Sequence, residues 1–227
     1  MNRRSVHVEG REVDLLADYP RSNRDIDLRA AEKTEEDRAI ARRFGKEFFD
    51  GERRHGYGGF TYHPRFWQPV VPGFRDHYHL TRDSSVLDVG CAKGFMVRDL
   101  QELIPGISVS GVDISEYAIG CADENVRPGL EVADARDLPY EDDSFDLVVS
   151  INTIHNLDLD GVVQALGEID RVSRNFAYVT VDAYRDEAEK ERMMKWNLTA
   201  QTILSDHEWV ETFAEAGYKG DYYWFVP

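Results

Sequence analysis

From Ser84 onward, short apolar runs alternate with segments of helical periodicity, and this alternation limits the possible folds more than any other feature. The segments between the runs repeat apolar residues every three or four positions, as an amphipathic helix does. A strand that leads through a helix to a neighbouring strand makes a right-handed crossover, which leaves the two strands parallel. We therefore expect an α/β fold with a parallel sheet covered by helices on both faces. The apolar runs are "SVLDV", "ISVSGVDI", "LEVADA", "FDLVVSIN" and "FAYVTVDAY".

The C-terminal part adds two more elements. "DHEWVETFAEAG" predicts a helix that ends at Gly217, and "YKGDYYWFVP" predicts a final strand whose direction the pattern leaves open. We expect two units in the chain, namely an N-terminal arm, helix and aromatic cap segment over residues 1–80 and a domain with the alternating pattern over residues 81–227.

The N-terminal part predicts one helix and one ordered loop. Thr34 and Asp37 resemble a capping box at a helix start. Ile40, Phe44 and Phe48 then recur every four residues and form one apolar helix stripe. The segment "GERRHGYGGFTYHPRFWQPVVPGF" follows and has many glycines, prolines and aromatic residues but no period. We expect it to be a loop packed by its own rings, because so many exposed aromatic residues would cause association.

The charge of the chain bears on its partners. It has 27 basic and 43 acidic residues among 227, a net charge of −16. This charge opposes binding to nucleic-acid phosphates and anionic lipids, so we expect no nucleic-acid and no membrane partner. The substrate is expected to be small, and neutral or cationic molecules meet less repulsion. Without an apolar run of about 18 residues or a signal peptide, and with only two cysteines, a cytoplasmic location is expected.

The stretch "VLDVGCAKGFM" contains the first strand-to-helix turn of the alternating part, where an open parallel sheet binds ligands. Gly90 and Gly94 fit neither the G-x-G-x-x-G pattern of dinucleotide sites nor the phosphate-loop pattern. A nicotinamide oxidoreductase is therefore disfavoured. Asp113 ends the second strand, where a carboxylate binds the two hydroxyl groups of a ribose. Asp134 follows the third strand and can accept a hydrogen bond from adenine N6, so the pattern suits an adenosine ligand without pyrophosphate.

Four motifs, "VLDVGCAKG", "GVDIS", "ADARDLP" and "FDLVVSINTIHNL", resemble in order and spacing those of class I S-adenosylmethionine-dependent methyltransferases. The resemblance covers about residues 84 to 184. It implies a Rossmann-like, doubly wound, mostly parallel seven-stranded sheet with a C-terminal antiparallel hairpin. It also implies S-adenosyl-L-methionine as cofactor and S-adenosyl-L-homocysteine as product. By the same resemblance, Asp88 and Gly90 lie by the methionine end of the cofactor, Gly94 starts a helix, Asp113 holds the ribose, Ile114 packs on the adenine, Asp134 meets N6, Ala135 donates a backbone amide and Asn152 faces the sulfonium.

Three features depart from the pattern of this family. Ala92 stands where the family usually has a middle glycine, and its small methyl group leaves room for the cofactor. "RVSRNFAYV" lacks the frequent Pro-Gly-Gly before the fifth strand, and "INTIHNL" is not the Pro-Pro-Tyr type used on amide and amine nitrogens. The last departure argues against methylation of nucleic acids or protein amides. We expect Lys93, in the turn itself, to point to solvent, with a carboxylate partner as the alternative.

The acceptor site is less explicit. Methyl transfer is an in-line displacement, so the enzyme must align the acceptor with the methyl group and the sulfur. Only an acceptor that loses a proton needs a general base, and His155 is the candidate because its ordinary pKa is near neutrality. Tyr57 and Arg65 in "GYGGFTYHPRFW" are the other candidate catalytic residues, since aromatic rings bind cations and arginine binds carboxylate or phosphate. Alternatively, these rings pack on the sheet edge and His155 is structural. No metal site is expected.

Several functions stay open at this point. We favour methyl transfer to an oxygen or nitrogen atom of a small-molecule metabolite, typical of small-molecule biosynthesis. The same cofactor also supports aminocarboxypropyl transfer, cyclisation or elimination, which give methylthioadenosine in place of S-adenosylhomocysteine. A non-catalytic protein that binds S-adenosylmethionine is the third alternative. The acceptor is left open, and so is the oligomeric state, with a homodimer as one option.

Overall fold

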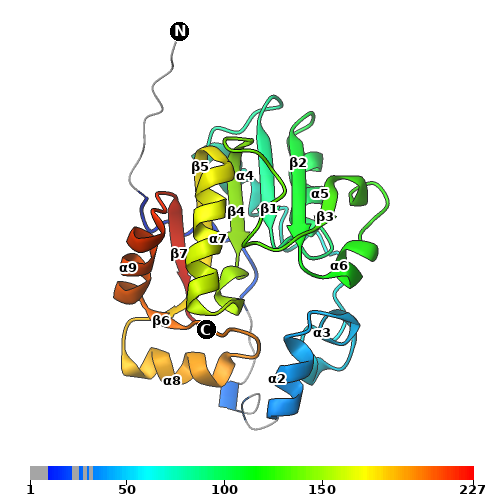
Figure 1. Cartoon of the computed structure of the whole chain (residues 1–227). Helices are drawn as coiled ribbons and strands as arrows, with labels where there is room; N and C mark the ends of the chain where they lie inside the picture. Colours follow the sequence, from blue (N-terminus) through cyan, green and yellow to red (C-terminus); the bar gives the residue numbers. More distant parts are fainter. Residues whose placement is uncertain (1–9, 22–25, 28–29, 31–32) are drawn as a thin grey trace.

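The computed structural model describes residues 10–21, 26–27, 30 and 33–227, and its centre is one seven-stranded sheet (Figure 1). The strand order is β3-β2-β1-β4-β5, and the outer edge of β5 pairs with both β6 and β7. The chain leaves β1 in one direction and returns through β4 on its other side, as in a doubly wound fold, which confirms the predicted fold class. The strands are β1 (Ser85–Val89), β2 (Ser108–Asp113), β3 (Leu130–Val132), β4 (Phe145–Ile151), β5 (Ser173–Tyr184), β6 (Leu204–Ser205) and β7 (Asp221–Phe225).

Every strand pair among the described residues is parallel, so the predicted C-terminal antiparallel hairpin is wrong. β7 runs in the same direction as β5, with Tyr178 opposite Asp221 and Asp182 opposite Phe225. The cause is α9 (Asp206–Ala216), which separates β6 from β7. A helix between two strands returns the chain to the starting end of the sheet, and the next strand is then parallel.

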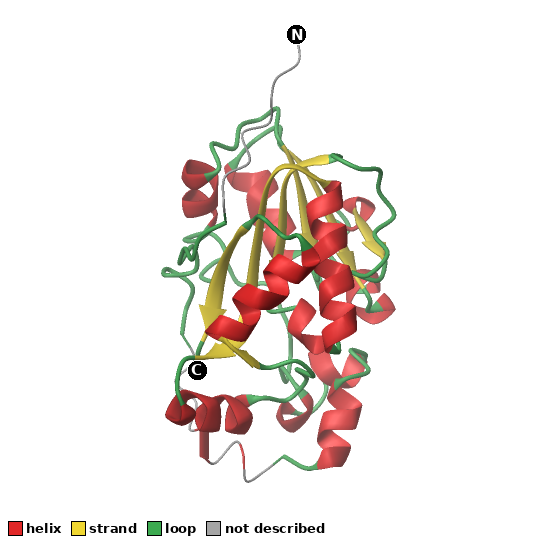
Figure 2. Ribbon diagram, turned by 60° about the vertical axis from the view of Figure 1, so that its left-hand side comes forward, coloured by secondary structure: helices red, strands yellow, loops and turns green. Residues whose placement is uncertain are grey.

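Helices cover both faces of the sheet, as the alternation predicts (Figures 1 and 2). The apolar side chains of α4 and α5 belong to one buried cluster, and those of α7 and α9 belong to the other. In α7, Val162, Leu166 and Ile169 are spaced by four and three residues and are fully buried. Burying each such side chain stabilises the fold by roughly 1.5–3 kcal/mol. Besides α9, the helices beside the sheet are α4 (Val71–His77), α5 (Phe95–Leu103), α6 (Glu116–Gly120) and α7 (Leu159–Val172).

Three further helices lie beyond the carboxyl ends of the strands (Figure 1). They are α2 (Glu35–Ala41), α3 (Lys46–Asp50) and α8 (Glu187–Trp196), and we call them the roof. The capping box predicted at the start of α2 is confirmed by both of its hydrogen bonds. The predicted single stripe is divided between α2 and α3, because Phe44 has a φ of +48° and breaks the helix.

The two parts of the roof, which are far apart in sequence, are tied together. The Lys33 ammonium donates hydrogen bonds to the backbone carbonyls of Lys195, Trp196 and Asn197. Arg38 adds a bond of 2.7 Å to the Asn197 carbonyl. These carbonyls close the C-terminal end of α8, where acceptors lack helical partners and the helix dipole is negative. The cations therefore hold α8 against the N-terminal segment.

The N-terminal unit is not packed separately from the sheet. Val71, Phe74 and Leu80 are buried in the cluster on the α5 face. A boundary near residue 80 thus divides the pattern of the sequence but not the core. Within the described ranges, no helix has the length and apolar character needed to cross a membrane. The described part of the chain also contains three short 3-10 helices, η1 (Arg53–His55), η2 (Arg127–Gly129) and η3 (Ile154–Asn156).

Candidate active site

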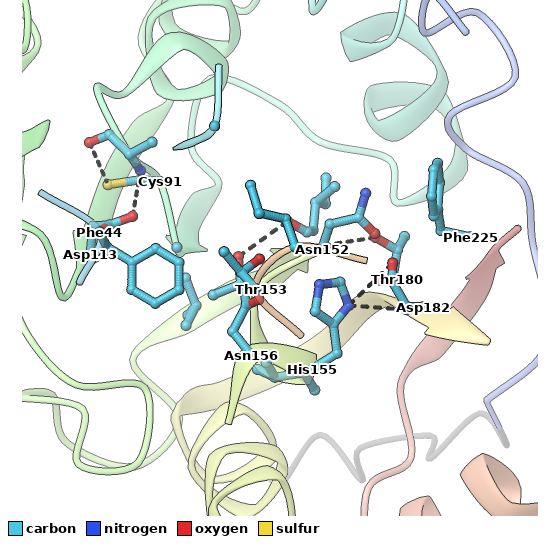
Figure 3. Close-up of a pocket in the computed structure, with 18 of the residues that line it drawn as sticks. Phe44, Cys91, Asp113, Asn152, Thr153, His155, Asn156, Thr180, Asp182 and Phe225 are labelled. Carbon is cyan, nitrogen blue, oxygen red and sulfur yellow. Dashed lines mark hydrogen bonds and ion pairs between the residues drawn. The ribbon is translucent and has the colours of Figure 1, made fainter. Parts of the chain in front are cut away.

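One cavity of about 1010 Å³ lies between the carboxyl ends of the strands and the roof (Figure 3). This volume is at the upper end of the range for small-molecule sites. We call the part next to the ends of β1, β2 and β3 the motif half. The part next to α8 and the end of β7 is the roof half. In Figure 3, Cys91 and Asp113 mark the motif half, Phe225 marks the roof half, and Asn152 and His155 lie between them.

The turn after β1 explains its residue types. Gly90 has a φ of +89°, and a Cβ there would lie 2.0 Å from the hydroxyl oxygen of Thr153, so no side chain fits. Ala92 has a φ of +51°, a left-handed conformation that glycine adopts without strain. The usual family glycine at this position therefore has a backbone cause, and Ala92 accepts some strain. Gly94 is the residue before α5, with a φ of +72°.

Two carboxylates line the motif half, one buried (Asp88) and one half-buried (Asp113). The Asp113 oxygens accept hydrogen bonds of 2.8 Å from the backbone N–H groups of Ala92 and Ser115, which fix the carboxylate beside the turn. Burial raises the pKa of Asp113 against these bonds. Asp88 is 5% exposed, and its carboxylate has no hydrogen-bond partner among the described residues. Burial, followed by the Asp113 charge, raises the pKa of Asp88 to about 7.

The remaining motif residues also line the cavity. Asp134 is held by Arg136, whose guanidinium nitrogens lie 3.0 and 2.6 Å from its two oxygens and lower its pKa. An adenine amine would share this carboxylate with Arg136. Ile114 is 55% exposed, which is unusual for a large apolar residue at a cavity and leaves its side chain open to a ligand. Ala135 lies beside them, so the predicted adenine residues are brought together.

Asn152 lies at the end of β4, between the two halves. Its side-chain oxygen accepts a hydrogen bond of 2.9 Å from the Thr180 hydroxyl, and its own backbone N–H bonds to Thr180 in return. Its φ is +52°. A residue held in a strained conformation at a cavity is often one that function requires.

His155 is buried in η3, and its ring is fixed from one side. Nδ1 accepts a hydrogen bond of 3.0 Å from the backbone N–H of Asp182 and lies 3.6 Å from the Asp182 carboxylate. Burial lowers the pKa of His155, although Asp182 opposes this effect. The neutral ring with an accepting Nδ1 carries its proton on Nε2.

Of the two candidate residues in the aromatic loop, Tyr57 and Arg65, the structure places only Tyr57 at the cavity. Tyr57 lines the cavity and packs against the rings of Phe48, Phe49 and Phe60. Arg65 is not among the lining residues. It is exposed, and its guanidinium lies 4.7 Å from the centre of the Phe66 ring.

We first expected Lys93 to point to solvent, and the structure shows that it does not. Its ammonium is buried, 2.6 Å from Asp50 and 2.8 Å from the Phe60 carbonyl. The Tyr117 hydroxyl donates a further bond of 2.8 Å to Asp50. The alternative, a carboxylate partner, is the observed one, and it ties the turn after β1 to the end of α3. We call the Lys93–Asp50 pair the latch.

Sequence reasoning missed much of the wall. Phe44 was placed in a helix stripe, yet it lies at the cavity, and its carbonyl accepts a hydrogen bond from Ser115, two residues after Asp113. A break in the helix at Phe44 had no signal except Gly45. The roof half contains arginines and aromatic side chains from three distant segments. These residues include Arg42, Arg185, Arg192, Trp196 and Phe225.

The motif half suits an adenosine sulfonium ligand. Asp88 offers a buried, unpaired carboxylate to a cationic group, and Asp113 offers a fixed carboxylate to hydroxyl groups. Gly90 leaves the backbone open where a Cβ would intrude. No group of histidine, cysteine or acidic residues within the described part of the chain could hold a metal ion.

Comparison with known proteins agrees with this geometry. A family model for a methyltransferase domain matches residues 87–181. A tRNA (carboxymethyluridine(34)-5-O)-methyltransferase of Arabidopsis thaliana is 31% identical over 63% of this chain and 33% of that protein. A phthiotriol/phenolphthiotriol dimycocerosates methyltransferase of Mycobacterium ulcerans is 30% identical over 54% of this chain and 48% of that protein. The chain thus spans less than two thirds of the length of most curated relatives it matches.

A solved complex of the Haloferax volcanii Trm112 methyltransferase activator with a methyltransferase matches 86% of this chain and 77% of that chain. Its TM-score is 0.51 at 24% identity, which shows a shared fold. S-adenosylmethionine is the cofactor of this family, and the residues of the motif half fit it. The matched methyltransferase domain spans residues 87–181, and its ordered motifs and its fold are those of the class I S-adenosylmethionine-dependent methyltransferases.

Proposed function

We propose that this protein transfers the methyl group of S-adenosylmethionine to an oxygen or nitrogen atom of a small-molecule metabolite. The observation that carries this proposal is the single cavity that continues from the motif half into the space beneath the roof. The roof combines α2 and α3 with α8, which is far from them in sequence, and hydrogen bonds from Lys33 and Arg38 tie these parts together. A concave site of this size, with apolar and aromatic walls between its polar groups, suits a small ligand.

Each group of residues has a task in this proposal. When bound, the cofactor supplies an electrophilic methyl group on a positively charged sulfur. Asp113 binds the ribose and Asp88 faces the cationic end, so the cofactor is oriented across the motif half. Asn152 is held by Thr180 where the two halves meet. The roof excludes water and holds the acceptor in line, which is the main requirement of a displacement reaction.

His155 has two possible tasks, and Asp182 decides between them. With Nδ1 accepting from the Asp182 backbone, Nε2–H donates a hydrogen bond and can orient an acceptor. A general base needs a bare Nε2 and therefore a proton on Nδ1. The Asp182 carboxylate lies 3.6 Å from Nδ1, and after a small rotation of the ring it can accept a hydrogen bond from a protonated Nδ1. A hydroxyl acceptor would use this second arrangement.

The relatives include both a tRNA methyltransferase and a dimycocerosates methyltransferase, so similarity alone does not identify the acceptor. The charge of −16 opposes binding of a tRNA backbone, since such binding depends on lysine and arginine. We therefore place RNA outside the proposed substrates.

The test is an incubation with methyl-labelled S-adenosylmethionine and a cell extract separated into small-molecule, RNA and protein fractions. Label in the small-molecule fraction, with S-adenosylhomocysteine as the remnant, supports the proposal. Label in RNA or protein contradicts the acceptor class. Methylthioadenosine as the remnant shows reaction at the aminocarboxypropyl group, and an unconsumed cofactor shows a binding protein.

A further inference from the structure

Arginine residues gather around the cavity of this acidic protein. Five arginines line it, and no lysine does so among the described residues. Two of the five are neutralised by acids. Arg136 lies 2.6 Å from Asp134, and Arg185 lies 2.9 Å from Glu12. The other three, Arg21, Arg42 and Arg192, have no carboxylate partner among the described residues.

Two of these unneutralised arginines lie in the roof half. Arg192 and Trp196 are four residues apart in α8, so they share one face of this helix, and both line the cavity. Arg42 follows α2, and its Nε donates a hydrogen bond of 3.3 Å to the backbone carbonyl of Thr199, just beyond α8. This bond leaves the guanidinium charge uncompensated. The same end of the cavity therefore presents two cations from different segments.

An aromatic wall adjoins these cations. The Trp196 ring lies 5.9 Å from the Phe225 ring, and both residues line the cavity. Aromatic side chains offer a flat apolar surface, and guanidinium groups offer planar, paired donors that match a carboxylate or phosphate. Both features favour one kind of ligand, an oxyanion attached to an apolar body.

We propose that Arg42 and Arg192 form an oxyanion subsite in the roof half, so that the methyl acceptor is a small molecule with a carboxylate or phosphate group. This inference rests on the proposed function, because it describes the acceptor of that same cavity. It replaces our expectation from net charge, which favoured neutral or cationic substrates. The 16 excess acids are distributed over the whole chain, whereas a ligand in the cavity meets the charges that line it.

The test measures binding of four small probes to the protein saturated with S-adenosylhomocysteine. The probes are phenyl phosphate, benzoate, benzyl alcohol and benzylamine. Their binding is measured by calorimetry or by tryptophan fluorescence. We expect the two anions to bind better than the alcohol and the amine. Arg192→Gln and Arg42→Gln should each weaken anion binding by about tenfold, as the loss of one charge-assisted contact does. Comparison of phenyl phosphate with benzoate distinguishes the two kinds of oxyanion.

The matched control is Arg43→Gln. Arg43 is exposed, adjoins Arg42 in sequence and does not line the cavity, so this variant should bind the anions as the wild type does. Equal losses in all three variants, preferred binding of benzylamine, or no anion binding at millimolar concentration would overturn the subsite. S-adenosylhomocysteine binding is measured first in every variant. If the wild type does not bind S-adenosylhomocysteine, the proposed function is contradicted. If it does bind, but Arg42→Gln and Arg192→Gln bind the anions as the wild type does, only the subsite is contradicted.

Discussion

The two halves of the cavity differ in how they are built. The motif half comes from turns that follow β1, β2 and β3, whose carboxyl ends meet at one edge of the sheet. The roof half combines the N-terminal segment, α8 and the end of β7, which meet only through tertiary packing. A parallel sheet brings short motifs together by its own regularity, whereas a roof depends on contacts between distant segments. In the proposed function, the first half binds the cofactor and the second half selects the acceptor.

The largest effect should come from the boundary between the halves. His155→Ala should lower turnover by about 100-fold if the acceptor loses a proton to His155, as loss of a general base does. Cofactor affinity should stay within about twofold, since His155 lies outside the motif half. Steady-state kinetics and calorimetry with S-adenosylhomocysteine check both parts. Unchanged turnover would make His155 a structural residue.

The same residue gives a pH prediction with a definite sign. Burial lowers the pKa of His155, and the base form is the neutral one, so activity should persist below the ordinary histidine pKa of about 6.5. Asp182 acts against burial, so Asp182→Asn should move the acid limb of kcat/KM to still lower pH. A limb that moves to higher pH would show that Asp182 does not act on His155.

Asp113→Ala should weaken S-adenosylmethionine binding by on the order of 2 kcal/mol, from lost charge-assisted hydrogen bonds to the ribose. Asp113→Asn is the paired variant, because it keeps the shape of the side chain, although its single amide oxygen can accept from only one of Ala92 and Ser115. Both variants should bind S-adenosylmethionine more weakly in calorimetry, and unfolding in urea should show a smaller loss of stability for Asn than for Ala, because Asn keeps one of the two hydrogen bonds. Normal affinity in both variants would remove the ribose assignment.

The latch tests whether the halves are independent. Lys93→Met removes one member of a mostly buried ion pair and should lower the free energy of unfolding by about 2–3 kcal/mol. Because Lys93 belongs to the cofactor turn and Asp50 to the roof, cofactor affinity should fall as well. Chemical denaturation and calorimetry measure these effects. The double variant Lys93→Met with Asp50→Leu should recover part of the free energy of unfolding that Lys93→Met alone loses. No recovery would show that the latch does not couple the two halves of the cavity.

The smallest expected effect concerns pH and the cofactor. Asp88 has its pKa raised to about 7, so it is partly protonated at neutral pH without ligand. The cationic cofactor favours the charged carboxylate, and affinity should therefore rise severalfold as pH increases from about 6 to 8. Binding should release protons, which calorimetry in buffers of different ionisation enthalpy detects. Asp88→Asn should remove the pH dependence, and a persistent dependence would assign it to another group.

Much of the fold and the motif half followed from the sequence because the relevant information is local. Gly90 and Asp113 each lie at the end of a strand with a recognisable apolar pattern. The direction of β7 did not follow, since it depends on the crossover through α9. Arg65 and Arg192 are both exposed arginines near aromatic residues, and only the position of α8 beyond the carboxyl ends of the strands brings Arg192 to the cavity. The partner of Lys93 could not be predicted either, because Asp50 reaches it only through the position of α3.

The division of the cavity is the central claim, and a crystal structure of the complex with S-adenosylhomocysteine tests it most directly. We predict the ribose hydroxyl groups within hydrogen-bonding distance of Asp113, the adenine against Ile114, and the space beside Arg192 and Trp196 left free for an acceptor. An adenosine group bound beneath α8, in contact with Arg192 and away from Asp113, would contradict the account.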